Sequence, residues 1–369
     1  MKQLKGLLMT LMCSSIIITG GCEFRDIDLR LFVVAIGVDI IPDQPELLRF
    51  NFKIAIPTGD PKSREGDVLI ITEDSSNIAA AIRQAKSKVD KEFDFSHCKG
   101  VLYGEAYARK GIRKMQDWTI RRRDIQLLMH PAVAVPTAEA VLRVQPKSER
   151  ITGSSLFLAL SEEGTESPYI TKVYSFDLAR RIQEKGEDPI LPVIEAANES
   201  LPDIKKVALM DKQKVKHILS PEETKWLNLL LYKDLRTNLG TNLDGYHYEM
   251  NATNTRSKFK IIDDGHGKGR IVYTIRIKGI LEEKDEEEEL SSRDLTRLEK
   301  EFDKSIAEDV LHLLTKVQAT KLDPLGFGLR FFGTHWNNDS EVEQWKEMYP
   351  RIQFDVIVKT EIKSTGYTR

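Results

Sequence analysis

The hydrophobic pattern of the N-terminal part of the chain predicts a sheet built around one buried strand. Leu31 to Val38 form a nearly continuous apolar run, which is typical of a strand buried on both faces. After a turn at Pro42 to Pro45, apolar and polar side chains alternate from Leu48 to Ile56. The two segments together predict a β-hairpin. Apolar residues from Ile78 to Val89 then recur at helical spacing, so we expect a helix after the hairpin.

The middle of the chain predicts further helices and short strands. Glu105 to Arg122 and Tyr169 to Glu187 are expected as helices. Residues 198–219 combine a polar linker with two short apolar segments that predict a second hairpin. We therefore expect residues 22–197 to form an N-terminal α/β region of one or two subdomains, followed by this linker and hairpin.

A second domain is expected over residues 220–369. Ser220, Pro221 and Glu223 fit a capping box with proline at the first helical position, which is a strong signal for the start of a helix. This new helix directly follows the linker and hairpin. We therefore place the domain boundary at this point.

The C-terminal domain is predicted to have an α+β fold. From Leu295 to Val317 apolar side chains step by three or four positions, which predicts one long amphipathic helix. The neighbouring strands are the nearest cover for this apolar stripe, so we expect the helix to lie across an antiparallel sheet. The predicted strands are Tyr246 to Asn254, Lys258 to Asp263, Arg270 to Glu282 and Ile352 to Val358.

The first 22 residues predict export and lipid attachment. A basic start precedes an apolar core from Gly6 to Ile18, and small residues lead to Cys22. The apolar core is shorter than the roughly 20 residues that a transmembrane helix needs. Residues 1–21 therefore resemble a lipoprotein signal peptide, after which the Cys22 thiol carries diacylglycerol. The alternative is an ordinary cleaved signal, with Cys22 in a disulfide to Cys98.

Composition and motif searches predict no catalytic chemistry. Loss of Lys2 and Lys5 with the signal reduces the 55 basic residues by two, against 57 acidic ones, so the mature net charge is about −4. Nothing in this balance indicates nucleic-acid binding. The seven histidines are scattered without metal-ligand spacing. We therefore expect no catalytic residue, no metal site and no cofactor.

Function is instead expected in surfaces that contact other proteins. One candidate surface directly follows the anchor, and another is the glycine-rich segment after the long helix. The alternative for the second segment is a tight turn whose phenylalanine fills the core. Arg121 to Arg123 could contact lipid headgroups. The alternative, that they form a solvated helix end, is the favoured interpretation. The candidate interface residues are Arg25, Asp26, Asp28, Asp323, Gly326, Phe327 and Gly328.

Several short motifs occur in an order that is informative as a set, although each is weak by itself. They cover nearly the whole mature chain. The motifs are Gly21-Cys22, Arg25 to Asp28, Val33 to Asp39, Phe95-Ser96-His97, Gly104-Glu105, Arg122 to Ile125, Asp323 to Gly328, Trp345, Tyr349-Pro350 and Thr365-Gly366.

This order resembles the C-subunit lipoproteins of spore nutrient germinant receptors, the Ger(x)C family. The resemblance implies a mixed α/β multidomain ectodomain without catalytic activity, anchored by lipid at the outer face of the spore inner membrane. It also implies integral membrane A- and B-type receptor subunits as partners in the response to nutrients. The chain departs from the family pattern at Glu23, where tryptophan is usual, and at Cys98, where serine is usual.

Two alternatives from other functional classes stay open on the sequence. An exported substrate-binding lipoprotein would show two similar lobes around a ligand cleft. A lipid-anchored hydrolase would show clustered His, Asp or Glu side chains with perturbed pKa values.

Overall fold

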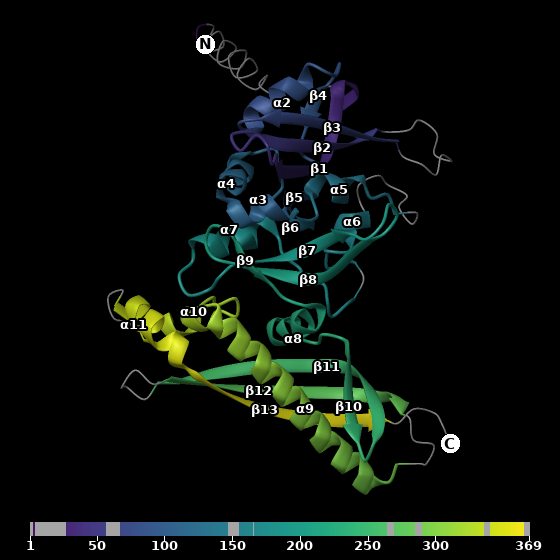
Figure 1. The fold of residues 1–369 in the computed structure, drawn as a ribbon, viewed down its shortest axis with the longest axis vertical. Coiled ribbons are helices and arrows are strands. Elements are labelled where there is room, and N and C mark those ends of the chain that lie inside the picture. The colour runs from purple at the N-terminus through teal and green to yellow at the C-terminus, as the bar shows by residue number, and fades with distance from the viewer. Residues whose placement is uncertain are drawn as a thin grey trace.

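The computed structural model describes residues 27–56, 67–146, 155–164, 166–263, 269–284, 290–335 and 340–364. They form two halves, each built on one β-sheet, which follow one another along the long axis of the molecule (Figure 1). Helix α8 (Pro221–Leu231) lies between the halves (Figure 1). Among the helices described, none combines the length and the apolar character needed to cross a membrane.

A nine-stranded mixed sheet forms the N-terminal half. Its order is β3-β2-β1-β5-β6-β7-β8-β9, and β4 pairs with the beginning of β1. Strands β1, β5, β6 and β7 run parallel, so their N-terminal ends lie at one edge of the sheet. The strands are β1 (Arg30–Ile40), β2 (Leu48–Ile56), β3 (Asp67–Ser75), β4 (Glu92–Asp94), β5 (Gly100–Gly104), β6 (His130–Val135), β7 (Ile190–Ala196), β8 (Pro202–Met210) and β9 (Val215–Ile218).

Strand β1 lies inside this sheet, as its apolar run predicted. Its residues from Val33 to Asp39 are buried. Val38 pairs with Phe50 and Val33 with Ile54 in the antiparallel β1-β2 ladder, which confirms the predicted hairpin. Because helices cover both faces of the sheet, a continuous apolar strand is stable there.

Two groups of helices cover the two faces of the first sheet (Figure 1). Buried residues of α5 and α6 form a cluster with Ala35 and Leu102. Helices α2, α3, α4 and α7 contribute to the larger core on the other face. These helices are α2 (Ile78–Lys86), α3 (Glu105–Lys110), α4 (Arg113–Arg121), α5 (Ala138–Arg143), α6 (Ser155–Leu158) and α7 (Ser175–Gln183).

Two predicted helices are shorter than expected. The predicted helix over 105–122 is broken at Gly111, whose φ is +150°, and Ile112 N–H donates instead to the Gln213 carbonyl at 2.9 Å. The predicted helix over 169–187 begins only at Ser175. The preceding segment is held by tertiary hydrogen bonds to α8, which local sequence patterns do not reveal.

The C-terminal half is a four-stranded sheet crossed by a long helix, which confirms the α+β prediction. Helix α9 (Ser292–Ala319) buries the predicted stripe, including Leu298, Phe302 and Val310, against the sheet. Short elements follow α9 at the end of this half that lies nearest the first half (Figure 1). Besides α9, the elements of the C-terminal half are β10 (Thr237–Leu243), β11 (Tyr246–Asp263), β12 (Gly269–Lys284), α10 (Phe327–Phe332), α11 (Ser340–Met348), η2 (Tyr349–Arg351) and β13 (Gln353–Ser364).

The predicted antiparallel sheet requires two corrections. Strand β13 joins β12 in parallel, with Gln353 beside Arg270. The reason is that α9 carries the chain back along the sheet, and parallel neighbours need such a crossover. The two strands predicted over 246–263 are one strand, β11, which passes through a bulge between Ala252 and Asn254.

The first sheet extends to the end of the segment expected as linker and hairpin. Residues 202–218 form the hairpin β8-β9, and β8 pairs with β7 as part of the sheet. Leu219 N–H still donates to Val207 O at 2.9 Å, and Ser220 caps α8 directly afterwards. The larger apolar cluster of the first half continues into the apolar core of the second half.

Candidate functional site at the joint between the two halves

Helix α8 provides the first connection between the halves. The predicted capping box is present, with Ser220 and Glu223 exchanging hydrogen bonds. Thr224 and Asn228 on this helix are fully buried. Thr224 Oγ1 accepts from Val207 N–H at 3.1 Å, and Asn228 Oδ1 accepts from Thr171 Oγ1 at 2.9 Å. Buried polar groups paired in this way hold α8 against the first half in one orientation.

Arg181 of α7 forms the centre of a second connection. Its side chain is only 8% exposed and forms ion pairs with Asp177 at 2.9 Å and Glu187 at 3.2 Å. The guanidinium also donates to the carbonyls of Asp188 at 3.2 Å and Pro324 at 3.0 Å. A rigid guanidinium with five donors can satisfy such a set of acceptors. Arg181 therefore links the first half to the segment that follows α9.

Asp323 fixes the start of α10 from a buried position. Its carboxylate accepts from Phe327 N–H at 3.0 Å and from Gly328 N–H at 2.7 Å. Gly326, at φ +72°, allows the backbone to turn between the carboxylate and these donors. Burial raises the pKa of the Asp323 carboxyl to about 7, although both backbone hydrogen bonds favour its charged form.

Gly186 and Gly328 allow the two backbones to touch. Leu329 N–H donates to Gly186 O at 2.8 Å. A Cβ atom on Gly186, whose φ is +78°, would lie 2.5 Å from the Gly328 carbonyl carbon. A Cβ atom on Gly328 would lie 2.6 Å from Trp345 Nε1. The contact therefore requires glycine on both sides.

The structure corrects the expectation that Asp323, Gly326, Phe327 and Gly328 form an exposed loop. All four are buried, and Phe327 begins a helix. The Phe327 ring has no exposed area and packs edge-on against Phe259 at 5.0 Å. Their burial leaves them little surface for contact with another protein. They join the halves within the chain. This agrees with the alternative interpretation of the segment, a tight turn whose phenylalanine fills the core.

The other predicted site residues lie near the start of the chain. Cys22, Arg25 and Asp26 are outside the described residues, so their predicted roles stay predictions. Asp28 is exposed in the short 3-10 helix η1 (Ile27–Leu29). Cys98 is a free, buried thiol.

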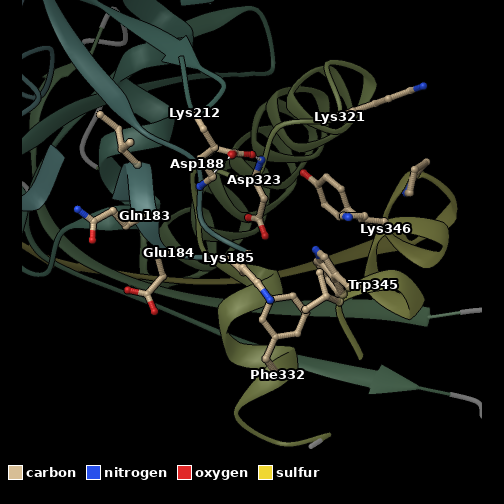
Figure 2. A pocket seen from close by; sticks show the side chains of 15 residues that line it. Gln183, Glu184, Lys185, Asp188, Lys212, Lys321, Asp323, Phe332, Trp345 and Lys346 are labelled. Carbon is tan, nitrogen blue, oxygen red and sulfur yellow. Dashed lines mark hydrogen bonds and ion pairs between the residues drawn. The ribbon is translucent and has the colours of Figure 1, made fainter. Parts of the chain in front are cut away.

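A cavity of about 500 Å³ opens at the joint (Figure 2). Its walls come from both halves and contain four lysines, but the described groups are engaged or point away. Lys212 donates to the carbonyls of Arg181 at 2.8 Å and Glu187 at 2.5 Å, and Lys346 pairs with Glu343 at 2.7 Å. Figure 2 shows Lys321 extending away from the other labelled side chains. The side chains around the cavity therefore serve mainly to hold the two halves together.

The described residues contain no metal-binding cluster at this joint. Within the described ranges, no three His, Cys, Asp or Glu side chains converge as metal ligands. Sequence reasoning missed Arg181, Asp188 and the role of Gly186. Their partners across the joint, such as Pro324 and Asp323, lie far away in the chain, so no local pattern marks this role.

Comparison with protein families then accounts for nearly the whole chain. Residues 23–196 match the family described as spore germination protein N-terminal domain. Residues 205–366 match the family described as spore germination B3/GerAC like, C-terminal. The chain belongs to the GerAC-like spore germination proteins. This is the germinant-receptor C-subunit family that the motif order resembled.

Individual relatives agree with this GerAC-like assignment. Spore germination protein KC of Bacillus subtilis (strain 168) is 24% identical over 400 residues, covering 98% of this chain and 96% of the relative. Putative spore germination protein YfkR of the same organism is 24% identical over 389 residues, with the same coverage. The crystal structure of the GerBC protein matches with a TM-score of 0.59 at 17% identity, over 89% of this chain and 96% of that one. The GerBC likeness establishes the shared fold.

The motifs typical of the GerAC-like proteins now have structural roles in this chain. Asp39, at the end of β1, accepts from Ala138 N–H at 2.7 Å and Glu139 N–H at 3.0 Å, and so holds α5 against the sheet. Trp345 and Tyr349 stack at 5.3 Å beside the joint. The family motifs therefore stabilise the fold and its joint.

Proposed function

We propose that this chain is the lipid-anchored C subunit of a spore germinant receptor and acts without catalysing a reaction itself. In this proposal Cys22 carries the lipid, and the ectodomain lies at the outer face of the spore inner membrane. Integral membrane A- and B-type subunits are its partners in the response to nutrients. The observation that carries the proposal is the match of both GerAC-like family regions across the mature chain.

The architecture supports a role in assembly. One continuous core and two sets of buried hydrogen bonds couple the halves, so the ectodomain can transmit position or force as one body. Its halves are built on unlike sheets of nine and four strands, whereas a substrate-binding lipoprotein would show two similar lobes. Two acidic side chains of the cavity, Asp188 and Asp323, accept hydrogen bonds from backbone N–H groups of the joint, which favours a structural role for them.

Germination of spores that lack this chain tests the proposal. We expect the response to at least one nutrient to be lost and to be restored by the wild-type chain. A Cys22→Ala chain should accumulate outside the membrane fraction and restore germination poorly. A Cys98→Ala chain is the matched control and should remain in the membrane fraction. Normal germination on every nutrient, or full membrane retention of Cys22→Ala, would contradict the proposal.

A further inference from the structure

One edge of the first sheet carries exposed apolar side chains. Leu127 and Leu128 lie in the turn that precedes β6 and are 39% and 64% exposed. Phe176, in the first turn of α7, is 46% exposed. Phe176 N–H donates to Leu127 O at 3.1 Å, so the two backbone segments are adjacent. Grouped exposed side chains of this size indicate a contact surface.

Cations flank these apolar side chains. Arg121 ends α4, Arg123 follows two positions later, and Lys99 precedes β5. All three are exposed, and none forms an ion pair with any residue that the structure describes. The acidic residue in the same turn, Asp124, is already paired with Arg122. The turn therefore presents uncompensated positive charge beside its leucines.

A series of contacts links this surface to the point where the chain enters the fold. Phe32, near the start of β1, packs edge-on against His97 at 4.9 Å between ring centres. Two residues earlier in the chain, the Phe95 ring lies 4.6 Å from the Arg122 guanidinium carbon. The start of β1 and the leucine-containing turn thus belong to the same edge of the sheet.

The proposed lipid anchor lies close to this edge in the chain. Arg30 begins β1, and Cys22 is eight positions earlier. Even a fully extended connection of this length spans no more than about 28 Å. Ile27 and Leu29 within it are 67% and 61% exposed. A lipid on Cys22 would therefore hold this edge of the sheet, more than any other part of the fold, near the bilayer.

We propose that this edge rests on an anionic bilayer surface, with Leu127, Leu128 and Phe176 in the interface and Arg121, Arg123 and Lys99 against lipid phosphates. Cations beside apolar side chains are a combination that binds anionic bilayers, and the proposed anchor holds this edge within reach of one. The orientation rests on the proposed lipid anchor. A second contact would fix the tilt of the ectodomain, which a single point of attachment leaves free.

Vesicle binding by the chain without its lipid tests this surface separately from the anchor. A chain that begins at Glu23 retains the whole described core, which extends from Val33 to Ile352. We expect it to sediment with vesicles of equal parts phosphatidylcholine and phosphatidylglycerol but not with phosphatidylcholine alone. Added salt should weaken the binding, because salt screens exposed charges.

Paired substitutions identify the surface. Arg121→Glu with Arg123→Glu should weaken vesicle binding by about tenfold or more, and Leu127→Ser with Leu128→Ser should also weaken it. Arg256→Glu with Lys258→Glu makes the same charge change on exposed positions of β11 and should have no such effect. Leu201→Ser is the apolar control, because Leu201 is 60% exposed at the opposite edge of the same sheet, next to the C-terminal end of β7.

Three outcomes would overturn the proposal. They are absence of binding to the anionic vesicles, equal loss of binding in the control variants, or unchanged vesicle binding together with impaired receptor assembly in the Arg121 and Arg123 variant. The last outcome would assign the surface to a protein partner. None of them bears on Cys22, because the tested chain carries no lipid, so failure here and failure of the anchor are distinguishable.

Discussion

Asp188 and Asp323 are joined by two hydrogen bonds although they lie 135 positions apart in the chain. Asp188 N–H donates to Asp323 O at 2.7 Å, and Asp323 N–H donates to Asp188 Oδ2 at 2.8 Å. The same Asp323 carboxylate caps α10 from within. One residue pair thus couples the edge of the first sheet to the start of the last helices.

The buried carboxyl of Asp323 predicts a pH-dependent stability. The unfolded chain loses this proton near the ordinary pKa of 3.8, whereas the folded chain keeps it to a pKa of about 7. The folded state therefore binds the extra proton between these values, and the free energy of unfolding should fall as pH rises from about 4 to about 7. The expected loss is a few kcal/mol, since one pKa unit corresponds to about 1.4 kcal/mol.

Denaturant unfolding at about pH 5 and about pH 8 measures this dependence. Asp323→Asn should be less stable than wild type, because an amide places a donor against a backbone N–H, but its stability should change less between the two pH values. Asp90→Asn, at an exposed position, should keep the wild-type dependence. An unchanged slope in Asp323→Asn would show that other groups cause it.

The contact between Gly186 and Gly328 predicts a steric cost for a single methyl group. Gly186→Ala combines a left-handed backbone with overlap onto backbone atoms, so we expect a loss of about 2–4 kcal/mol in unfolding free energy. Gly245→Ala is the matched control, because Gly245 has φ +90° and no atom within 4 Å of the new Cβ. It should cost about 1 kcal/mol. Equal losses in the two variants would mean that the joint tolerates the methyl group.

The apolar stripe of α9 predicts a large difference between its two faces. Phe302 has no exposed area, so Phe302→Asp buries a charge without a partner and should cost several kcal/mol. Leu311 on the same helix is 40% exposed, and Leu311→Asp should change stability by about 0.5 kcal/mol or less. Thermal unfolding followed by circular dichroism compares them. Similar midpoints would place Phe302 in water.

Burial of Cys98 predicts an unreactive thiol. The side chain is 2% exposed, and burial raises its pKa to about 12. Since the thiolate is the reactive form, the native chain without Cys22 should react with a disulfide reagent only after unfolding. A chain with Leu201→Cys supplies an exposed thiol as the positive control. Rapid labelling of native Cys98 would show that the first half opens readily.

The amino-acid pattern alone determined the elements whose signals are local. The apolar run of β1, the capping box at Ser220 and the stripe of α9 each follow from residue spacing, because burial of one face or one helix end needs only near neighbours in the chain. Motif order also identified the family, which the two family matches then established.

Only the tertiary structure decided how these elements meet. The parallel placement of β13, the early break at Gly111 and the burial of Phe327 depend on contacts with residues far away in sequence. The glycines after α9 suited an exposed loop equally well, because conformational freedom and close packing favour the same residue. Gly186 and Arg181 lie across the joint and pack against this segment, so the segment is buried and is not an exposed loop.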